Sequence, residues 1–391
     1  MVKGVSPIIS VVLLILISVS AIYLVLNVAK PTIDRAYESA AMNEAGQNMQ
    51  LLDNLIREVA SEGTGSSRNV VLKVSDGDYR VVNTSGNFTG AVQYKIDLKY
   101  SPFAASMFKK VGNLKYTAGP NFIGLVGYWN FNERNGTTAA DNSGYGNDGT
   151  LYNGSTSCGN PPTTGAECPQ WIDGKYGKAL SFDGSNDYVN ITNSTSLNPS
   201  KISIELWVKP NSLQNLKGVI SKGESGNNRW YVEINNTQYN WFVNDEGTWY
   251  AVGTSLTITN DVWKHLVFTY NGSVMKAYLN GTDVSQSPSY GSYSSSLPSL
   301  PTVSGNLYIS SVGAAGYFNG TIDEVRIYPR ALIAEEVKEN YNAKASNYQV
   351  VLDYSKIILT GTAKLGKGEQ KICIEKTGEL NSKPLVRITK C

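Results

Sequence analysis

The feature that most constrains this chain is an apolar stretch without charged residues near its N-terminus. It runs from Val5 to Ala29, after a start of four residues in which Lys3 is the only charged side chain. A helix needs roughly 20 apolar residues to cross the hydrocarbon core of a bilayer. The stretch therefore predicts a membrane-spanning helix, with the positively charged start inside the cell and the rest of the chain outside.

Apolar residues continue beyond this stretch at spacings of three and four, which is typical of one face of a helix. They are Ile33, Ala36, Tyr37, Ala40, Ala41, Met49, Leu52, Ile56 and Val59. Residues 5–60 thus predict one helix of roughly 80 Å. We expect its large apolar surface to be buried first in lipid and then against copies of the same chain. A cleaved secretory signal peptide is the alternative.

The first residues resemble the short leader of archaeal type IV prepilins. The resemblance rests on the sequence KGVSPII at positions 3–9, directly before the apolar stretch. It implies that a prepilin peptidase cuts between Gly4 and Val5, and that mature chains assemble as a homo-oligomeric filament through their N-terminal helices. Ile9 stands where bacterial pilins usually have glutamate, which favours the archaeal branch.

The distribution of tryptophan indicates a change of domain in the middle of the chain. All seven tryptophans lie between residues 124 and 344, whereas the flanks carry short strand-like segments. This predicts a domain inserted at a loop tip of a small β-rich head. The predicted parts are a leader (1–4), a helix (5–60), the first half of a pilin head (61–122), an insertion (123–344) and the second half of the head (345–391). The predicted fold class is α+β, with a long N-terminal helix and a β-rich head interrupted by an all-β sandwich.

The inserted block has the patterns of antiparallel strands. Between residues 201 and 209, apolar side chains occupy every second position, which predicts a half-buried strand. Asn-Gly pairs at 271–272 and 280–281 favour tight hairpin turns. Many short strands without a long helix predict a sandwich or jelly roll.

The same block resembles the laminin-G-like, concanavalin-type jelly rolls. Five stretches carry the resemblance: GLVGYWNF (124–131), DNSGYGNDGTL (141–151), LSFDGSNDYV (180–189), WKHLVFTYNG (263–272) and GTIDEVRIYPRAL (320–332). They follow one another over nearly all of residues 124–343. The resemblance implies a jelly-roll fold exposed for adhesion, with glycans or surface proteins as partners.

This resemblance also implies a structural calcium ion. Members of the family often hold Ca²⁺ between the loop after the first strand and the last strand. The matching positions are Asp141, Asn147 and Asp323, with backbone carbonyls completing an oxygen shell. The alternative is that Asp141 and Asn147 only form side-chain turns in a glycine-rich loop.

Four aromatic residues form the candidate glycan-binding face, because sugar sites combine exposed aromatic rings with a few polar groups. They are Tyr239, Trp241, Trp249 and Tyr250, on two adjacent predicted strands. The alternative place for these side chains is the core of the sandwich.

Charge and histidine content narrow the possible functions. Only 17% of the residues are charged, the net charge is +2 and no basic stripe stands out, so nucleic acid is not an expected partner. The single histidine, His265, leaves no histidine-based triad or multi-histidine zinc site, and we expect it to be hydrogen-bonded within a strand. Glu205 is the most strand-like acid, but the paired carboxylates of a jelly-roll hydrolase are not recognisable. The chain is therefore not expected to be an enzyme.

Cysteine spacing and sequons point to the outside of the cell. The four cysteines form two local pairs, which predict the disulfides Cys158–Cys168 and Cys373–Cys391 and an oxidising compartment. Ten Asn-X-Ser/Thr sequons are candidates for N-glycosylation. They are Asn83, Asn87, Asn135, Asn153, Asn190, Asn193, Asn235, Asn271, Asn280 and Asn319.

These features together predict a structural subunit of an archaeal type IV pilus or pilus-like filament, whose jelly roll is exposed for adhesion or glycan binding. The predicted localisation is the cell membrane before assembly and an extracellular filament afterwards. One alternative is a single-pass, membrane-anchored lectin-like protein that does not polymerise. A secreted glycoside hydrolase is the other alternative.

Overall fold

The computed structural model describes most of the chain after the N-terminal apolar stretch. The described residues are 18, 30–83, 90–97, 108–111, 114–118, 124–159, 168–212, 215–223, 229–235, 238–254, 258–288, 293–312, 316–342, 347–354, 356–361 and 363–391. The predicted leader, the cleavage site at Gly4 and Val5, and the sequon at Asn87 lie outside these residues.

Strands dominate the fold, and this corrects the predicted class. The structure is 50% strand and 14% helix. Within the described residues, α2 (Lys30–Ser61) has 32 residues and α3 (Ala334–Asn342) has nine. The predicted α+β fold, with a long N-terminal helix and a pilin head, is therefore wrong. The physical reason is that the flanks and the inserted block all pair into sheets, which leaves the helices as minor elements.

No helix in the described part of the chain is both long and apolar enough to cross a bilayer. Helix α2 begins with charged residues, among them Lys30 and Asp34. The predicted localisation, which places the chain in the cell membrane before assembly, is wrong on this finding. Apart from Ser18, the apolar stretch at 5–29 lies outside the described residues.

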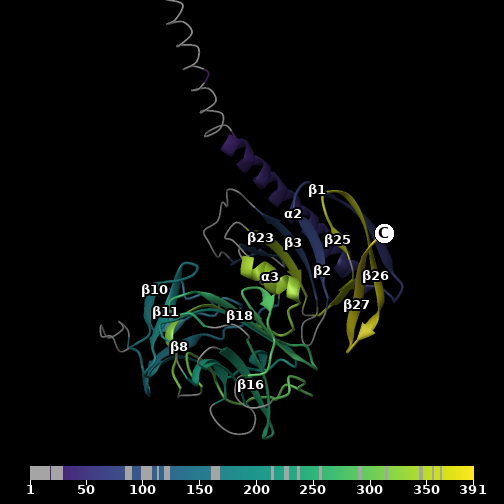
Figure 1. The fold of residues 1–391 in the computed structure, drawn as a ribbon. Helices are drawn as coiled ribbons and strands as arrows, with labels where there is room; N and C mark the ends of the chain where they lie inside the picture. The colour runs from purple at the N-terminus through teal and green to yellow at the C-terminus, as the bar shows by residue number, and fades with distance from the viewer. Residues whose placement is uncertain are drawn as a thin grey trace, which may run out of the picture.

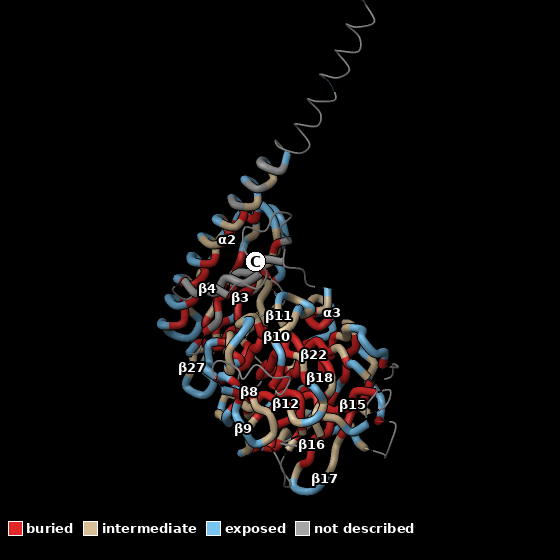
Figure 2. The backbone as a smooth tube through the Cα atoms, turned by 90° about the vertical axis from the view of Figure 1, so that its left-hand side faces the viewer, coloured by how far each residue is buried: buried red, intermediate tan, exposed pale blue. Residues whose placement is uncertain are grey.

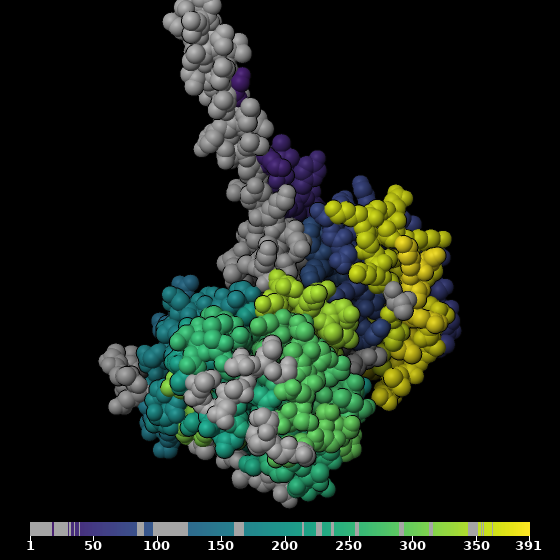
Figure 3. All heavy atoms as spheres, in the orientation of Figure 1, coloured from purple at the N-terminus to yellow at the C-terminus, as the bar shows by residue number. Residues whose placement is uncertain are grey.

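Both flanks of the chain contribute strands to the same two sheets. The four-stranded sheet has the order β1 (Ser67–Val74), β26 (Gly368–Leu380), β27 (Lys383–Lys390) and β24 (Ile358–Gly361). The six-stranded sheet has the order β25 (Lys364–Leu365), β2 (Asp78–Val82), β3 (Ala91–Asp97), β23 (Asn347–Asp353), β5 (Leu114–Ala118) and β4 (Phe108–Val111). Early and late segments therefore form one unit, which we call the head; Figure 3 shows the yellow C-terminal residues beside the blue early strands.

Helix α2 supplies one side of the core of the head. Its fully buried residues, spaced by three and four, are Ala45, Met49, Leu52, Ile56 and Val59. They pack against strands of both sheets, so the second half of the predicted apolar stripe is covered by the chain itself and not by other copies. At the other end, α2 projects from the body of the molecule, and Ile33 and Tyr37 are 54% and 73% exposed (Figure 1).

Two larger sheets form the inserted domain, which is a sandwich. The first contains β10 (Gln170–Asp173), β11 (Lys178–Asp183), β22 (Asn319–Tyr328), β13 (Ile202–Pro210), β18 (Lys264–Tyr270), β19 (Met275–Leu279) and β20 (Thr282–Asp283), with β6 (Gly127–Trp129) paired to β22. The second contains β17 (Thr248–Gly253), β16 (Gln238–Asp245), β15 (Arg229–Asn235), β14 (Lys217–Lys222), β21 (Leu307–Ile309), β12 (Asp187–Ile191), β8 (Gly149–Asn153) and β7 (Thr138–Ala139), with β9 (Thr156–Ser157) paired to β8. The short 3₁₀ helix η2 (Thr195–Leu197) follows β12. We call the two sheets the β13 sheet and the β16 sheet.

The core of the sandwich follows the alternation of its strands. In β13, the predicted apolar face, Ile202, Ile204, Leu206 and Val208, is fully buried between the two sheets. The residues between them point to the outer side of the sheet, where Asn340 and Tyr341 of α3 contact Glu205 and Trp207. The alternation therefore predicts the inner face correctly, and Figure 2 shows the buried residues concentrated in this domain.

Both predicted disulfides are confirmed. Cys158 pairs with Cys168, and Cys373 on β26 pairs with the last residue, Cys391. A disulfide stabilises mainly by restricting the unfolded chain, and the second one also ties down an end that normally frays.

An ionic contact joins the sandwich to the head. Glu339 on α3 accepts hydrogen bonds from both terminal nitrogens of Arg80 on β2, at 3.0 and 3.4 Å. Lys95 on β3 lies 3.4 Å from the same carboxylate. All three side chains are partly exposed, so we expect this contact to weaken as salt is added.

Candidate functional site

Nine residues form a grid on the outer face of the β16 sheet. Tyr239, Trp241 and Val243 of β16 point into the core, so the residues between them point outward. Cross-strand pairing then sets three rows across β15, β16 and β17. The rows are Arg229–Asn244–Trp249, Tyr231–Phe242–Ala251 and Glu233–Asn240–Gly253. We call these nine residues the β15–β17 face.

Aromatic rings of the β15–β17 face contact one another around a cation. Tyr231 stacks on Phe242 with ring centres 5.3 Å apart and meets Trp249 edge-on at 5.8 Å. The guanidinium of Arg229 lies 5.2 Å from the centre of the Trp249 ring and 5.9 Å from that of Tyr231. Arg229, Tyr231 and Trp249 are partly exposed, whereas Phe242 is buried beneath them. These contacts hold two accessible rings in a fixed arrangement.

The polar residues of the face are more deeply buried than the rings. Glu233, Asn240 and Asn244 are 3%, 0% and 5% exposed. Asn244 accepts a hydrogen bond from the backbone N–H of Gly247, which closes the turn between β16 and β17. Burial, together with the negative charge of Glu233, raises the pKa of Tyr231, so its hydroxyl stays protonated. The face therefore offers hydrogen-bonding groups next to flat apolar surface.

The structure divides the four predicted aromatic residues between two places. Trp249 lies on the β15–β17 face, and Tyr250 is partly buried against the core. Tyr239 and Trp241 are 1% and 0% exposed inside the sandwich and cannot meet a ligand on the surface. The predicted set mixes two faces because neighbouring positions in a strand point to opposite sides.

Two residues of the β15–β17 face, Arg229 and Tyr231 on β15, were not among those predicted from the sequence. They alternate with the core residues Trp230 and Val232, and this alternation in the sequence RWYVEIN is the signal that could have found them. The partner strand, however, can only be assigned once the pairing is known.

Asp141 and Asn147, two predicted calcium ligands, belong to one loop but are saturated with other contacts. The carboxylate of Asp141 accepts hydrogen bonds from the N–H groups of Tyr128, Ser143 and Asn147, and from the Ser143 hydroxyl. Asn147 accepts a hydrogen bond from Ser194 through its side-chain oxygen. These contacts resemble the side-chain turns of the alternative interpretation. A cation would have to displace them.

Asp323, the third predicted ligand, lies elsewhere. It sits on the outer face of β22, where its Oδ2 accepts a hydrogen bond from the backbone N–H of Tyr176 at 3.0 Å. Burial, and then the charge of Glu324, raises the pKa of Asp323 well above its usual value. No group of three His, Cys, Asp or Glu side chains that could hold a metal occurs within the described residues. The three residues as placed do not fit one calcium shell, and calcium binding stays a prediction.

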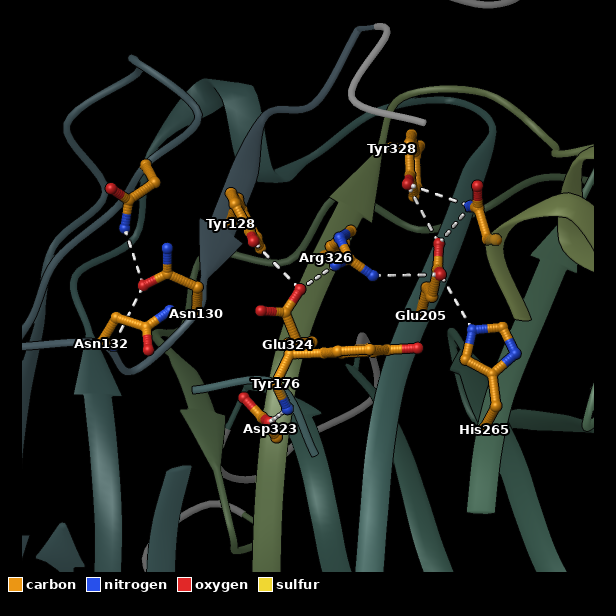
Figure 4. A network of polar contacts seen from close by, with 12 residues as sticks. Tyr128, Asn130, Asn132, Tyr176, Glu205, His265, Asp323, Glu324, Arg326 and Tyr328 are labelled. Carbon is orange, nitrogen blue, oxygen red and sulfur yellow. Dashed lines mark hydrogen bonds and ion pairs between the residues drawn. The ribbon is translucent and has the colours of Figure 1, made fainter. Parts of the chain in front are cut away.

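A buried polar network lies on the outer face of the β13 sheet (Figure 4). At its centre, Glu205 accepts hydrogen bonds from four side chains. They are His265 at 2.9 Å, Arg326 at 3.2 Å, Tyr328 at 3.0 Å and Asn340 at 2.8 Å. Burial raises the pKa of Glu205, but Arg326 and His265 outweigh it, so the pKa lies below its usual value. The fully buried Glu205 is therefore an ionised anchor for α3, and a substrate cannot reach it.

A bulge in β22 completes this network. Glu324 has a positive φ of 55°, and the pairing of β13 with β22 shifts at this point. As a result, Asp323 and Glu324 both point away from the core although they are consecutive. Glu324 pairs with Arg326 and accepts a hydrogen bond from Tyr128. The bulge thus places Glu324 beside the buried guanidinium of Arg326, which also contacts Glu205 of β13.

The predicted glycosylation sites differ in how strongly their side chains are engaged. The side-chain oxygen accepts a hydrogen bond at Asn83, Asn153, Asn193, Asn271, Asn280 and Asn319. Asn135 is exposed, and Asn190 and Asn235 are partly buried. Occupancy by glycans stays a prediction at all of these positions.

Asp187, the first residue of β12, makes the stability of the fold depend on pH. Burial and the charge of Asp183 raise its pKa to about 7 from 3.8. The folded state therefore binds a proton that the unfolded state has lost, so stability falls as pH rises from about 4 to about 7. Asp187 is 2% exposed, but the neighbouring Asp183 and Ser185 are exposed to solvent, so we expect a loss of only about 1–2 kcal/mol over this window. Asp187→Asn should remove it in urea unfolding followed from pH 4 to pH 8. A wild-type stability that rises with pH over the window while the variant stays flat would contradict the assignment.

Comparison with known proteins identifies the sandwich. A family model described as the concanavalin A-like lectin/glucanases superfamily matches residues 183–338. Domain 4 of AbnA, an extracellular arabinanase from Geobacillus stearothermophilus solved with arabinotriose, is 22% identical with a TM-score of 0.43, over 57% of this chain and 99% of that one. The binding domain of Paraclostridial Mosquitocidal Protein 1 is 19% identical with a TM-score of 0.44, over 56% and 52% of the two chains.

A third solved structure, the binding domain of botulinum neurotoxin serotype G, is 16% identical with a TM-score of 0.41. The match covers 56% of this chain and 50% of that one, so the chain spans about half of either toxin domain. No curated protein matches the chain. The family match does not include the N-terminal residues, and the resemblance to archaeal prepilins stays a prediction. The family match over residues 183–338, together with the two packed sheets, supports a laminin-G-like, concanavalin A-like jelly-roll domain in the inserted block.

Proposed function

We propose that this protein is an extracellular binding protein whose jelly roll binds carbohydrate across the β15–β17 face. The observation that carries the proposal is the pair of accessible rings, Tyr231 and Trp249, held around Arg229. Sugars stack their apolar faces on such rings, while nearby amides and carboxylates fix their orientation. Two disulfides support a place outside the cytosol, where such bonds persist.

The proposal includes no catalysis. A glycoside hydrolase needs two carboxylates that flank the bond it breaks. Glu205, the strand acid considered for this role, is fully buried and accepts hydrogen bonds from four side chains. On the β15–β17 face, Glu233 is the only carboxylate among the nine residues, which suits binding better than cleavage.

Replacing Trp249 by Ala should lower affinity for a retained polysaccharide at least tenfold, because stacking on this ring is lost. Affinity electrophoresis against a panel of immobilised polysaccharides measures the effect. Trp263→Ala is the matched control, since Trp263 is also partly exposed and also has a cation, Lys209, over its ring at 5.5 Å. If the control loses binding and Trp249→Ala does not, the ligand lies on another face.

A role as subunit of a pilus-like filament is the second candidate. It is supported by the outer end of α2, where Ile33 and Tyr37 are exposed although they continue the apolar stripe of the helix. Self-association there would cover them, and a prepilin peptidase and copies of the same chain would then be partners. Electron microscopy of sheared surface material tests it: filaments that contain this chain are expected, and their absence removes the candidate.

A further inference from the structure

We propose that the ligand of the β15–β17 face is a neutral sugar whose neighbouring hydroxyl groups are recognised by the carboxamide of Asn240. This inference rests on the proposed function and goes further by naming the class of ligand and the residue that selects it. Asn240 lies in the middle strand of the face, directly opposite Glu233 and Gly253.

The carboxamide of Asn240 has unused hydrogen-bonding capacity. The residue is 0% exposed, and neither its oxygen nor its nitrogen has a hydrogen-bond partner among the described residues. Buried polar side-chain atoms are usually paired, so each exception needs a physical explanation. A carboxamide left unpaired lowers stability, and ligand recognition is a reason to keep one.

Gly253 leaves the space that this carboxamide occupies. A Cβ atom at position 253 would lie 2.4 Å from the Asn240 oxygen and would force it to move. Pro288 lies on the same side, with its Cα 3.5 Å from that Cβ position. Because Asn240 is 0% exposed, a ligand reaches its carboxamide only when the atoms that cover it shift.

The neighbouring charge indicates which ligands fit. A carboxamide offers a donor and an acceptor side by side, which matches two adjacent hydroxyl groups of a sugar. A ligand carboxylate can only accept, and here it would face the negative charge of Glu233, which is 3% exposed. A hydroxyl group, by contrast, can donate to Glu233 or to the Asn240 oxygen. The site therefore favours neutral sugars over uronic acids.

Asn240→Ala and Gly253→Ala test the inference in the full chain. We expect both to weaken binding to neutral polysaccharides such as xylan, arabinan, mannan and glucans by at least tenfold. Because Asn240→Ala removes no hydrogen bond among the described residues, its melting temperature should equal or exceed that of the wild type. Acidic polymers such as polygalacturonate and alginate should not be retained by the wild type.

The outcomes separate the two proposals. Full binding by Asn240→Ala, together with loss of binding by Trp249→Ala, overturns the role of Asn240 and leaves carbohydrate binding in place. Retention of acidic polymers alone overturns the choice of neutral sugars. If Asn240→Ala loses binding and also has a lower melting temperature, Asn240 stabilises the fold and does not act as a ligand contact. Wild-type protein that retains none of the polymers removes the proposed function itself.

Discussion

Replacing Glu205 by Ala is expected to destabilise the protein by about 3–5 kcal/mol, because it removes one charge of a buried ion pair and leaves the other behind. The carboxylate is fully buried and lies 3.2 Å from the guanidinium of Arg326. It also holds Asn340, which attaches α3 to the sheet. Urea unfolding followed by circular dichroism measures the loss.

Asp173→Asn is the control for this change. Asp173 also pairs with a basic side chain, Lys178 at 2.7 Å, but the carboxylate side chain is 92% exposed. Such exposed pairs contribute little to stability, so we expect almost no loss for Asp173→Asn. Equal effects for the two variants would show that Glu205 is not the centre of a buried network.

Replacing Trp241 by Ala is expected to cost about 3–5 kcal/mol of stability, since it removes a large side chain from the core of the sandwich. Trp241 is 0% exposed, and the centre of its ring lies 6.2 Å from that of Phe268 in the opposite sheet. Thermal unfolding should show a large fall in the midpoint.

Trp249→Ala is the matched change eight residues along the chain. Trp249 is partly exposed and lies on the opposite side of the β16 sheet, so we expect its stability cost to be about 1 kcal/mol or less. The two substitutions therefore distinguish a residue of the sandwich core from a residue of the β15–β17 face. If Trp249→Ala unfolds as readily as Trp241→Ala, the β15–β17 face is part of the core and the site is misplaced.

Local patterns predicted the jelly roll well. The alternation in β13 identified its inner face, and the Asn-Gly pairs lie where the expected turns occur, after β18 and after β19. Both signals depend on residues close in sequence, which is why they can be interpreted without knowing the fold.

The β15–β17 face was only partly predictable, because its residues come from three strands. Trp241 and Phe242 are adjacent aromatic residues, and either could face the core. Only the pairing with β15 shows that Phe242 joins Tyr231 and that Trp241 faces inward. Alternate positions in a strand point to opposite faces of the sheet. When both faces carry aromatic rings, this alternation does not show which face is buried.

The buried network was not predictable for a related reason. His265 and Arg326 lie 60 and 121 residues after Glu205 in the chain, and long-range pairing of three strands brings them together. The bulge at Glu324 also shifts the register between β13 and β22, and no local sequence pattern predicts this shift. The predicted class failed for another reason: both the flanks and the inserted block pair into sheets, so the helices are minor elements of the fold.

A crystal structure of the protein with a bound neutral oligosaccharide tests the central claim most directly. The account predicts density for sugar rings over Tyr231 and Trp249, with hydroxyl groups directed toward the row of Glu233 and Asn240. An oligosaccharide bound elsewhere on the jelly roll, for example beside the loop of Asp141, would contradict it.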